Sequence, residues 1–259
     1  MTIYALHMIT ARKSAWFERV FAVYNRNLLA RRFEGLRVAG LRHLRERTRG
    51  VPLVLYANHS SWWDGLVAFE IGRACALDQY VMMEERQLAR LRLFRRLGAF
   101  SVERERAREA RRSVEYACEL LRGTEGALWL FPQGVTLAND VRPLKFYTGA
   151  AHIIRRAGGA YVAPVAMRYE FLEEFRPEAF ARVGAPERVT VDESFDVKDL
   201  TRHLSDELTR TLDRLRADVL EAKFEEYEEI VAPRRRAASK GREDAKRAAG
   251  AVDGEDVDG

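Results

Sequence analysis

The residues whose types and spacing best suit acid–base chemistry in this chain are His59 and Asp64, which stand five positions apart. They directly follow an apolar run at residues 51–57, which predicts a buried strand that ends in a polar turn. In open α/β proteins, functional side chains usually lie at the edge of the sheet where strands end. A histidine acts well as a general base when a carboxylate fixes its tautomer and stabilises the imidazolium. We therefore take His59 and Asp64 as a candidate catalytic pair.

On spacing alone this pair is a weak signal, because a histidine and an aspartate at such a separation often occur by chance. Asp64 would also favour the N-terminus of a following helix without any catalytic role. Ser60 and Ser61, which lie between the two, lack the glycine-flanked elbow of the α/β-hydrolases. We interpret these serines as hydrogen-bonding loop residues.

Alternating strands and helices must hold these residues in place. Further apolar runs predict strands at residues 79–83, 99–102, 127–131, 160–167 and 189–195. Apolar residues at helical spacing separate the first four of these strands, and a leucine repeat from Leu200 onward predicts a long helix that packs on the sheet. This alternation predicts an α/β fold, a single domain with a mostly parallel central sheet flanked by helices.

Composition divides the chain into a basic N-terminal helical segment at residues 1–35, a folded domain at residues 36–231 and a tail at residues 232–259. The tail consists largely of charged residues, alanine and glycine and contains no aromatic residue. A segment of this composition cannot bury enough apolar surface to fold, so we predict that the tail is disordered.

The N-terminal segment concentrates the positive charge. Residues 1–50 carry eleven basic and three acidic side chains, a net charge of +8 against +5 for the whole chain. Residues 13–31 predict a basic amphipathic helix that is rich in aromatic residues. Such a helix suits an anionic lipid interface, and it equally suits docking on the domain with a solvated basic face. No recognised nucleic-acid-binding module appears, so we expect no nucleic-acid partner.

Membrane-spanning and metal-binding patterns are missing from the sequence. No stretch approaches the ~18 uncharged apolar residues that a spanning helix needs, so a role at a membrane would be peripheral. Cys75 and Cys118 have no partner at metal-binding spacing, and we expect neither a disulfide framework nor a zinc site. This use of cysteine is typical of a reducing cytoplasm.

Four blocks of the sequence together resemble the glycerolipid acyltransferase family, which includes the lysophosphatidic acid acyltransferases. The resemblance spans roughly residues 36–170, within the segment that we therefore name the acyltransferase domain. The first and third blocks are the most diagnostic. The blocks are the histidine, four residues and aspartate from His59 to Asp64; the glycine-to-arginine stretch from Gly98 to Arg104; the stretch Phe131, Pro132, Gln133 and Gly134; and the strand around Pro164.

The resemblance implies transfer of a fatty acyl group from acyl-CoA or an acyl carrier protein to a hydroxyl of a lysophospholipid such as lysophosphatidic acid. It implies that His59 takes the hydroxyl proton while Asp64 orients the imidazole, so that no serine nucleophile is needed. Arg104 matches the family position that receives the acceptor's phosphate. The block from Phe131 to Gly134 is expected at the substrate, with backbone N–H groups near Gly134 as oxyanion donors.

The resemblance also implies the surroundings of such an enzyme. The acyl thioester is a co-substrate, and we expect no cofactor and no metal. The expected partners are membrane lipids and the acyl donor, and the expected place is the cytoplasm, peripherally bound at the inner face of the cell membrane.

The third block departs from the family's pattern. Gln133 stands where the family usually has glutamate, and residues 135–137 lack the arginine that commonly follows the glycine. Arg142 and Lys145 are the nearest candidates to replace that arginine. These departures keep open the same chemistry on another hydroxylated lipid or glycolipid. A catalytically silent membrane-binding protein is the alternative of another class, and the intact histidine–aspartate pair argues against it.

Three further residues have aromatic rings near the predicted site. Trp62 and Trp63 lie within the first block. We expect one of them to line a substrate channel and the other to pack in the core. His152 lies on a predicted helix, and we interpret it as a structural histidine.

Overall fold

The computed structural model describes residues 8–47 and 50–234, so nearly all of the predicted tail lies outside the described residues.

In the described part, nine strands form one sheet with the order β4-β3-β5-β2-β6-β7-β1-β9, and β8 pairs with β6. The strands are β1 (Leu36–Ala39), β2 (Leu53–Ala57), β3 (Gln79–Glu84), β4 (Ala99–Val102), β5 (Ala127–Leu130), β6 (Gly159–Glu170), β7 (Glu178–Val183), β8 (Glu187–Thr190) and β9 (Tyr227–Val231). The helices are α1 (Ala15–Arg32), α2 (Leu41–Arg45), α3 (Asp64–Ala74), α4 (Glu85–Arg90), the 3-10 helix η2 (Arg92–Leu97), α5 (Ala107–Leu121), α6 (Gly149–Ala157) and α7 (Val197–Leu220).

One part of the sheet is parallel. The neighbouring strands β4, β3, β5, β2 and β6 all run in the same direction. The carboxyl ends of these strands therefore meet at one edge, where the chain leaves each strand for a helix or loop. The turn from His59 to Asp64, Arg104 and the block from Phe131 to Gly134 all lie at this edge.

The rest of the sheet is mixed, and the prediction of a mostly parallel sheet is wrong. β7 and β8 run antiparallel to β6, and β9 runs antiparallel to β1. Only residues 171–177 connect β6 to β7, and a connection this short permits an antiparallel return but not a crossover helix. The predicted α/β class holds, whereas the predicted strand directions do not.

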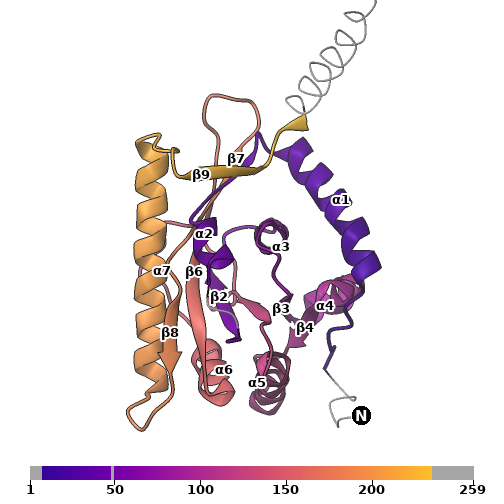
Figure 1. Cartoon of the computed structure of the whole chain (residues 1–259), viewed down its shortest axis with the longest axis vertical. Coiled ribbons are helices and arrows are strands. Elements are labelled where there is room, and N and C mark those ends of the chain that lie inside the picture. The colour runs from indigo at the N-terminus through magenta and orange to yellow at the C-terminus, as the bar shows by residue number, and fades with distance from the viewer. Residues whose placement is uncertain (1–7, 48–49, 235–259) are drawn as a thin grey trace, which may run out of the picture.

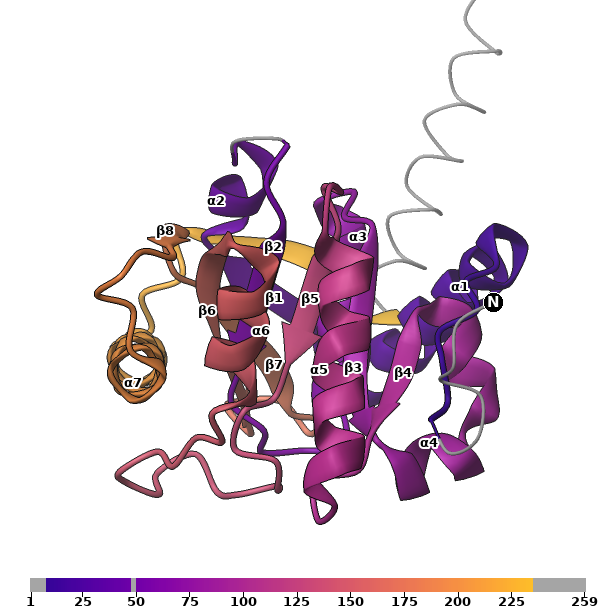
Figure 2. The same ribbon diagram turned by 90° about the horizontal axis from the view of Figure 1, so that it is seen from below.

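Both faces of the sheet are covered by helices, because successive side chains of a strand point to opposite faces. On β2, Leu53 and Leu55 pack in the core that includes α3, whereas Val54 and Tyr56 pack in the core that includes α5, α6 and α7. All residues of β2 are consequently buried. α7 and α1 lie at opposite sides of the molecule (Figure 1), and α5 and α6 cross the front of the sheet in Figure 2.

α1 begins after Ser14, whose Oγ accepts a hydrogen bond from the backbone N–H of Phe17 at 3.4 Å. It docks on α3 and η2 through Phe21, whose ring lies 5.1 Å from that of Phe69 and 5.7 Å from that of Phe94. Buried Asn25 donates to a carboxylate oxygen of Glu70 at 2.8 Å, and burial raises the pKa of that carboxyl. These contacts fix α1 to the domain.

The outer surface of α1 is also apolar. Trp16, Val20, Val23 and Tyr24 are exposed there, among arginine side chains. α1 therefore combines both arrangements that the sequence left open, since one side docks on the domain and the other presents apolar and basic groups. No helix among the described residues has both the length and the apolar character to cross a bilayer.

Candidate active site

His59 and Asp64 form a hydrogen-bonded pair at the edge where the parallel strands end. β2 ends at Ala57 and α3 begins at Asp64, so the intervening turn folds the chain back on itself. Nδ1 of His59 lies 2.8 Å from Oδ2 of Asp64. Because a carboxylate oxygen only accepts, Nδ1 carries the hydrogen and Nε2 keeps a free lone pair. This is the tautomer that a general base needs.

Asp64 is fully buried, and its carboxylate is held by further donors. Oδ2 also accepts the backbone N–H groups of Ser60 at 2.7 Å and Ser61 at 2.9 Å. Oδ1 accepts the hydroxyl of Tyr169 at 2.7 Å. These donors and the N-terminus of α3 replace the water that an exposed carboxylate would bind. The carboxylate of Asp64 is thereby held in a fixed orientation.

Gln133 positions the backbone of the histidine. Its side-chain oxygen accepts the N–H of His59 at 2.9 Å, and its side chain is buried rather than on the cavity wall. The carbonyl of His59 accepts the N–H of Leu137 at 2.8 Å. The segment after β5 therefore holds both backbone groups of His59. An uncharged amide does this without placing a second carboxylate beside Asp64.

Asn58 joins the end of β2 to β6. Its side-chain oxygen accepts the N–H of Met167 at 2.8 Å, and its amide donates to the carbonyl of Met167 at 2.9 Å. These two hydrogen bonds continue the connection between β2 and β6 beyond the last parallel pair, Ala57 and Val165. The start of the catalytic turn is thus tied to the same strand that carries Tyr169.

Arg104 and Gly134 lie against each other at the cavity. Nη1 of Arg104 donates to the carbonyl of Gly134, and the guanidinium lies 5.3 Å from the ring centre of Tyr147. Gly134 has φ +68°, and a Cβ at this position would overlap Nη1 of Arg104. Only glycine fits between these two side chains.

The N–H of Gly134 is already used, which corrects one expectation. It donates to the carbonyl of Phe131 at 2.9 Å and so is closed to an oxyanion. This hydrogen bond closes the four-residue turn from Phe131 to Gly134, whose central residues are Pro132 and Gln133. Donors for an oxyanion have to come from other groups around the cavity.

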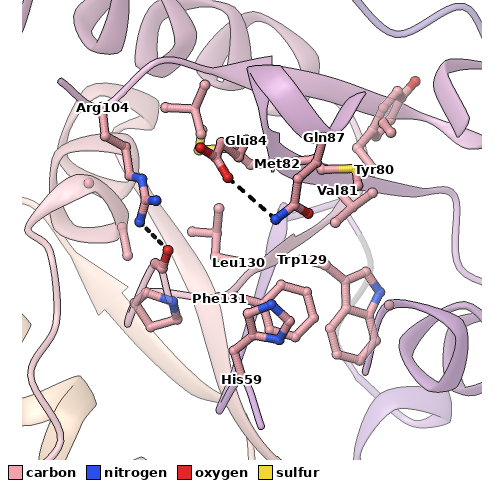
Figure 3. A pocket seen from close by; sticks show the side chains of 18 of the residues that line it. His59, Tyr80, Val81, Met82, Glu84, Gln87, Arg104, Trp129, Leu130 and Phe131 are labelled. Atoms are coloured by element: carbon pink, nitrogen blue, oxygen red, sulfur yellow. Dashed lines mark hydrogen bonds between the residues drawn. The ribbon is translucent and has the colours of Figure 1, made fainter. Parts of the chain in front are cut away.

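A cavity of about 760 Å³ opens beside His59. Its buried lining is mostly apolar and includes Leu66, Phe69, Leu97 and Trp129, with Gln79 as a buried polar residue. Phe131 and Pro132 also line it, and the ring of Phe131 lies 5.0 Å from that of His59. The lining residues nearer the surface include the polar side chains of Glu84, Gln87, Arg104, Arg111, His152 and Arg156. Figure 3 shows Arg104, Glu84 and Gln87 across the pocket from His59, Phe131 and Trp129.

Other residues that the sequence brought into question are now placed. His152 and exposed Trp62 line the cavity, whereas Trp63 packs against Phe33 with ring centres 5.0 Å apart. Arg142 and Lys145 are not on the cavity wall, and Arg142 pairs with Asp213 at 2.6 Å. Neither takes the place of the arginine missing after Gly134.

Sequence reasoning missed Tyr169 and Glu84. Tyr169 is 105 positions from Asp64 and belongs to no motif, so only the pairing of the strands shows that they meet. Glu84 is the last residue of β3, which pairs with β4, the strand that leads to Arg104. Its position at a strand end beside this strand is the one signal that could have indicated Glu84. Within the described residues no group of three or more histidine, cysteine or acidic side chains could hold a metal ion.

The comparisons with known proteins agree with this geometry. The family described as Acyltransferase matches residues 35–168, which is more than half of the chain. A 1-acyl-sn-glycerol-3-phosphate acyltransferase of Streptococcus pneumoniae is 29% identical over 43% of this chain and 40% of its own length. A lyso-ornithine lipid O-acyltransferase of Brucella abortus is 33% identical over 61% of this chain and 58% of its own length. The matched region thus covers less than two thirds of either relative, while the family match spans all four motif blocks. The chain belongs to the acyltransferase family.

Proposed function

We propose that this protein transfers a fatty acyl group from a thioester to a hydroxyl of a lysophospholipid-like acceptor. The observation that carries the proposal is the hydrogen-bonded pair of His59 and Asp64 beside a cavity with an apolar interior. The family and the names of both relatives support the same reaction class. Acyl-CoA or an acyl carrier protein supplies the thioester.

In the proposed reaction, Nε2 of His59 takes the proton of the acceptor hydroxyl as its oxygen attacks the thioester carbon. A carbon–oxygen bond forms, and the carbonyl oxygen becomes an oxyanion. The oxyanion collapses, the carbon–sulfur bond breaks, and the imidazolium returns its proton to the leaving thiolate. Asp64 stabilises the imidazolium in between. The acyl chain lies in the apolar part of the cavity, where its burial favours binding.

The direct test is thiol release from acyl-CoA or acylated carrier protein with a panel of lysolipid acceptors. We expect release that depends on the acceptor and yields the diacylated lipid. If no donor and acceptor pair gives release from a folded protein, the result would contradict this proposal and favour a catalytically silent membrane-binding protein.

A second proposal concerns the acceptor, which we infer carries a cationic group like that of a lyso-ornithine lipid. Glu84 points into the cavity, and within the described residues it has the amide of Gln87 at 3.3 Å as its hydrogen-bond donor and no ion-pair partner. A carboxylate here attracts an ammonium group and repels a phosphate. The relative that matches more of this chain is the one named for lyso-ornithine lipid. The arginine missing after Gly134 also disfavours a phosphate monoester.

Replacing Glu84 with glutamine is expected to lower kcat/KM for lyso-ornithine lipid about tenfold, a change that corresponds to ~1.4 kcal/mol of lost attraction. Activity with lysophosphatidic acid should stay equal or rise, because a repulsive charge is removed. The measurement is kcat/KM with both acceptors, with Glu85→Gln as the control because Glu85 lies outside the cavity wall. Equal losses with both acceptors would show that Glu84 does not select the headgroup.

We further propose that the protein binds the inner face of the cell membrane peripherally, through the outer surface of α1. The support is the exposed apolar group of Trp16, Val20, Val23 and Tyr24, set among arginines in the most basic part of the chain. Aromatic and basic side chains together suit the interface of an anionic bilayer.

The double substitution Trp16→Ser and Val23→Ser is expected to lower partitioning onto vesicles that contain anionic phospholipid about tenfold, because less apolar surface inserts. Vesicle sedimentation measures this, with Leu220→Ser as a control that removes an equally exposed apolar residue from α7. Raised salt should weaken binding of the unaltered protein. Binding that ignores anionic lipid, salt and both substitutions would contradict the proposal.

A further inference from the structure

Tyr169 contacts the catalytic pair from the side opposite the histidine. It lies near the end of β6, and its hydroxyl donates to Oδ1 of Asp64 at 2.7 Å. His59 contacts the other oxygen, Oδ2, at 2.8 Å. The three side chains therefore form one chain of hydrogen bonds, in which the carboxylate lies between the phenol and the imidazole. No motif of the sequence includes Tyr169.

The ring of Tyr169 is held firmly enough to fix its hydroxyl. It packs against Phe33 with ring centres 5.6 Å apart, and Phe33 in turn contacts Trp63 beside Asp64. Burial of the hydroxyl, together with the charge of Asp64, holds the pKa of Tyr169 well above its usual value. The phenol thus keeps its proton at physiological pH and can only meet the carboxylate as a donor.

We propose that Tyr169 is a positioning residue of the acyltransferase site, whose hydroxyl fixes the orientation of the Asp64 carboxylate and limits the charge that this carboxylate presents to His59. The inference deepens the proposed function, because it concerns the same base. Tyr169 belongs to none of the four motif blocks, and the proposal adds it as a third residue beside His59 and Asp64.

The physical reason is that a carboxylate shares its negative charge among all the donors that it accepts. The hydroxyl of Tyr169 draws charge toward Oδ1 and so weakens the attraction between Oδ2 and the proton on the imidazole. It also prevents rotation of the carboxylate, since Oδ2 is held by Ser60 and Ser61 and Oδ1 by the phenol. Without the hydroxyl, Oδ1 is a buried acceptor with no donor, and the imidazolium form of His59 becomes more favourable.

Charged groups on β6, on its loop to β7 and on β1 and β7 form ion pairs with one another, while Glu84 and Arg104 lie across the cavity from His59. On β6, Arg168 pairs with Glu170 and lies 3.5 Å from Asp140. Arg176, in the loop after β6, pairs with Glu34 at 2.7 Å. On the adjoining strands, Arg37 of β1 pairs with Glu178 of β7 at 3.2 Å. Loss of the phenol hydroxyl leaves these pairs unchanged, so a titration shift reports on the contact with Asp64.

The test is Tyr169→Phe, which removes only the hydroxyl. We expect the acidic limb of the kcat/KM profile to move to higher pH by about half a unit, and kcat at its plateau to fall about tenfold. Tyr227→Phe is the matched control, since Tyr227 donates to buried Asp218 at 2.8 Å in the same way but far from His59. A fall in activity without movement of the acidic limb, or an equal movement in the control, would overturn the proposal.

A second measurement does not depend on activity. In protein that carries ¹⁵N-labelled histidine, the imidazole resonances of His59, assigned by their loss in His59→Gln, report its tautomer and its titration midpoint. Tyr169→Phe is expected to raise that midpoint by about half a unit, and Tyr227→Phe to leave it in place. An unchanged midpoint refutes the role of Tyr169 even in a protein that transfers no acyl group. A raised midpoint without turnover refutes the proposed function alone.

Discussion

Replacing His59 with alanine is expected to lower kcat/KM for acyl transfer roughly a thousandfold, because it removes the imidazole that takes the proton of the acceptor hydroxyl. The fold should survive, since Asp64 keeps the N–H groups of Ser60 and Ser61 and the hydroxyl of Tyr169. The side chain of His59 is 24% exposed, so its removal opens only a small space at the cavity wall. Acceptor-dependent thiol release and thermal unfolding measure the two effects separately.

The matched control for this substitution is His203→Ala. His203 also contacts a carboxylate, Oε2 of Glu187, at 2.6 Å, but the pair is on the surface and outside the cavity wall. Its loss should leave kcat/KM within about twofold of the unaltered protein, as for other surface substitutions. Acceptor-dependent release that persists in His59→Ala would show that another group is the base.

The second large effect is expected from Asp64→Asn, with a loss of about 10²- to 10³-fold in kcat/KM and little loss of stability. An asparagine can keep a hydrogen bond with each group that contacts Asp64. Its carbonyl oxygen takes the place of Oδ2, and its amide donates to the oxygen of Tyr169, which can also accept. Of the donors to Asp64, only the phenol O–H loses its acceptor. The charge that stabilises the imidazolium is lost, so the activity falls while the geometry remains.

Asp64→Ala provides the contrast. It leaves the N–H groups of Ser60 and Ser61 and the hydroxyl of Tyr169 buried without their acceptor, and each such group costs about 1–3 kcal/mol. The alanine variant should therefore unfold at a clearly lower temperature than the asparagine variant. Two results would contradict this description of the site: full activity in Asp64→Asn, or equal thermal stability of the two variants.

Most of the parallel part of the fold could be predicted because its signals are local. The apolar run before His59 is β2, and the strand predicted at residues 99–102 is β4. Buried parallel strands are continuous apolar runs, and helices between them carry their own periodicity. Both patterns depend on near neighbours in the sequence.

The antiparallel part could not be predicted in the same way. β1, β7 and β9 carry charged side chains among their apolar ones, and β9 exposes glutamate side chains, so none has a strong apolar pattern. Their place depends on hydrogen bonds to strands far away in the chain, as in the pairing of β1 with β9. The direction of β7 is decided by the short return from β6, which sequence periodicity does not record.

The sequence by itself indicated the family and the candidate pair, because His59, Asp64 and the four blocks are defined by residue types at short separations. Tertiary structure alone decided what surrounds them. It turned Gln133 toward the backbone of His59, closed the N–H of Gly134, placed Glu84 in the cavity and brought Tyr169 to Asp64. These contacts join strands and loops that are far apart in the sequence and adjacent in the sheet. Hydrogen bonds between such distant residues produce no periodic pattern in the sequence.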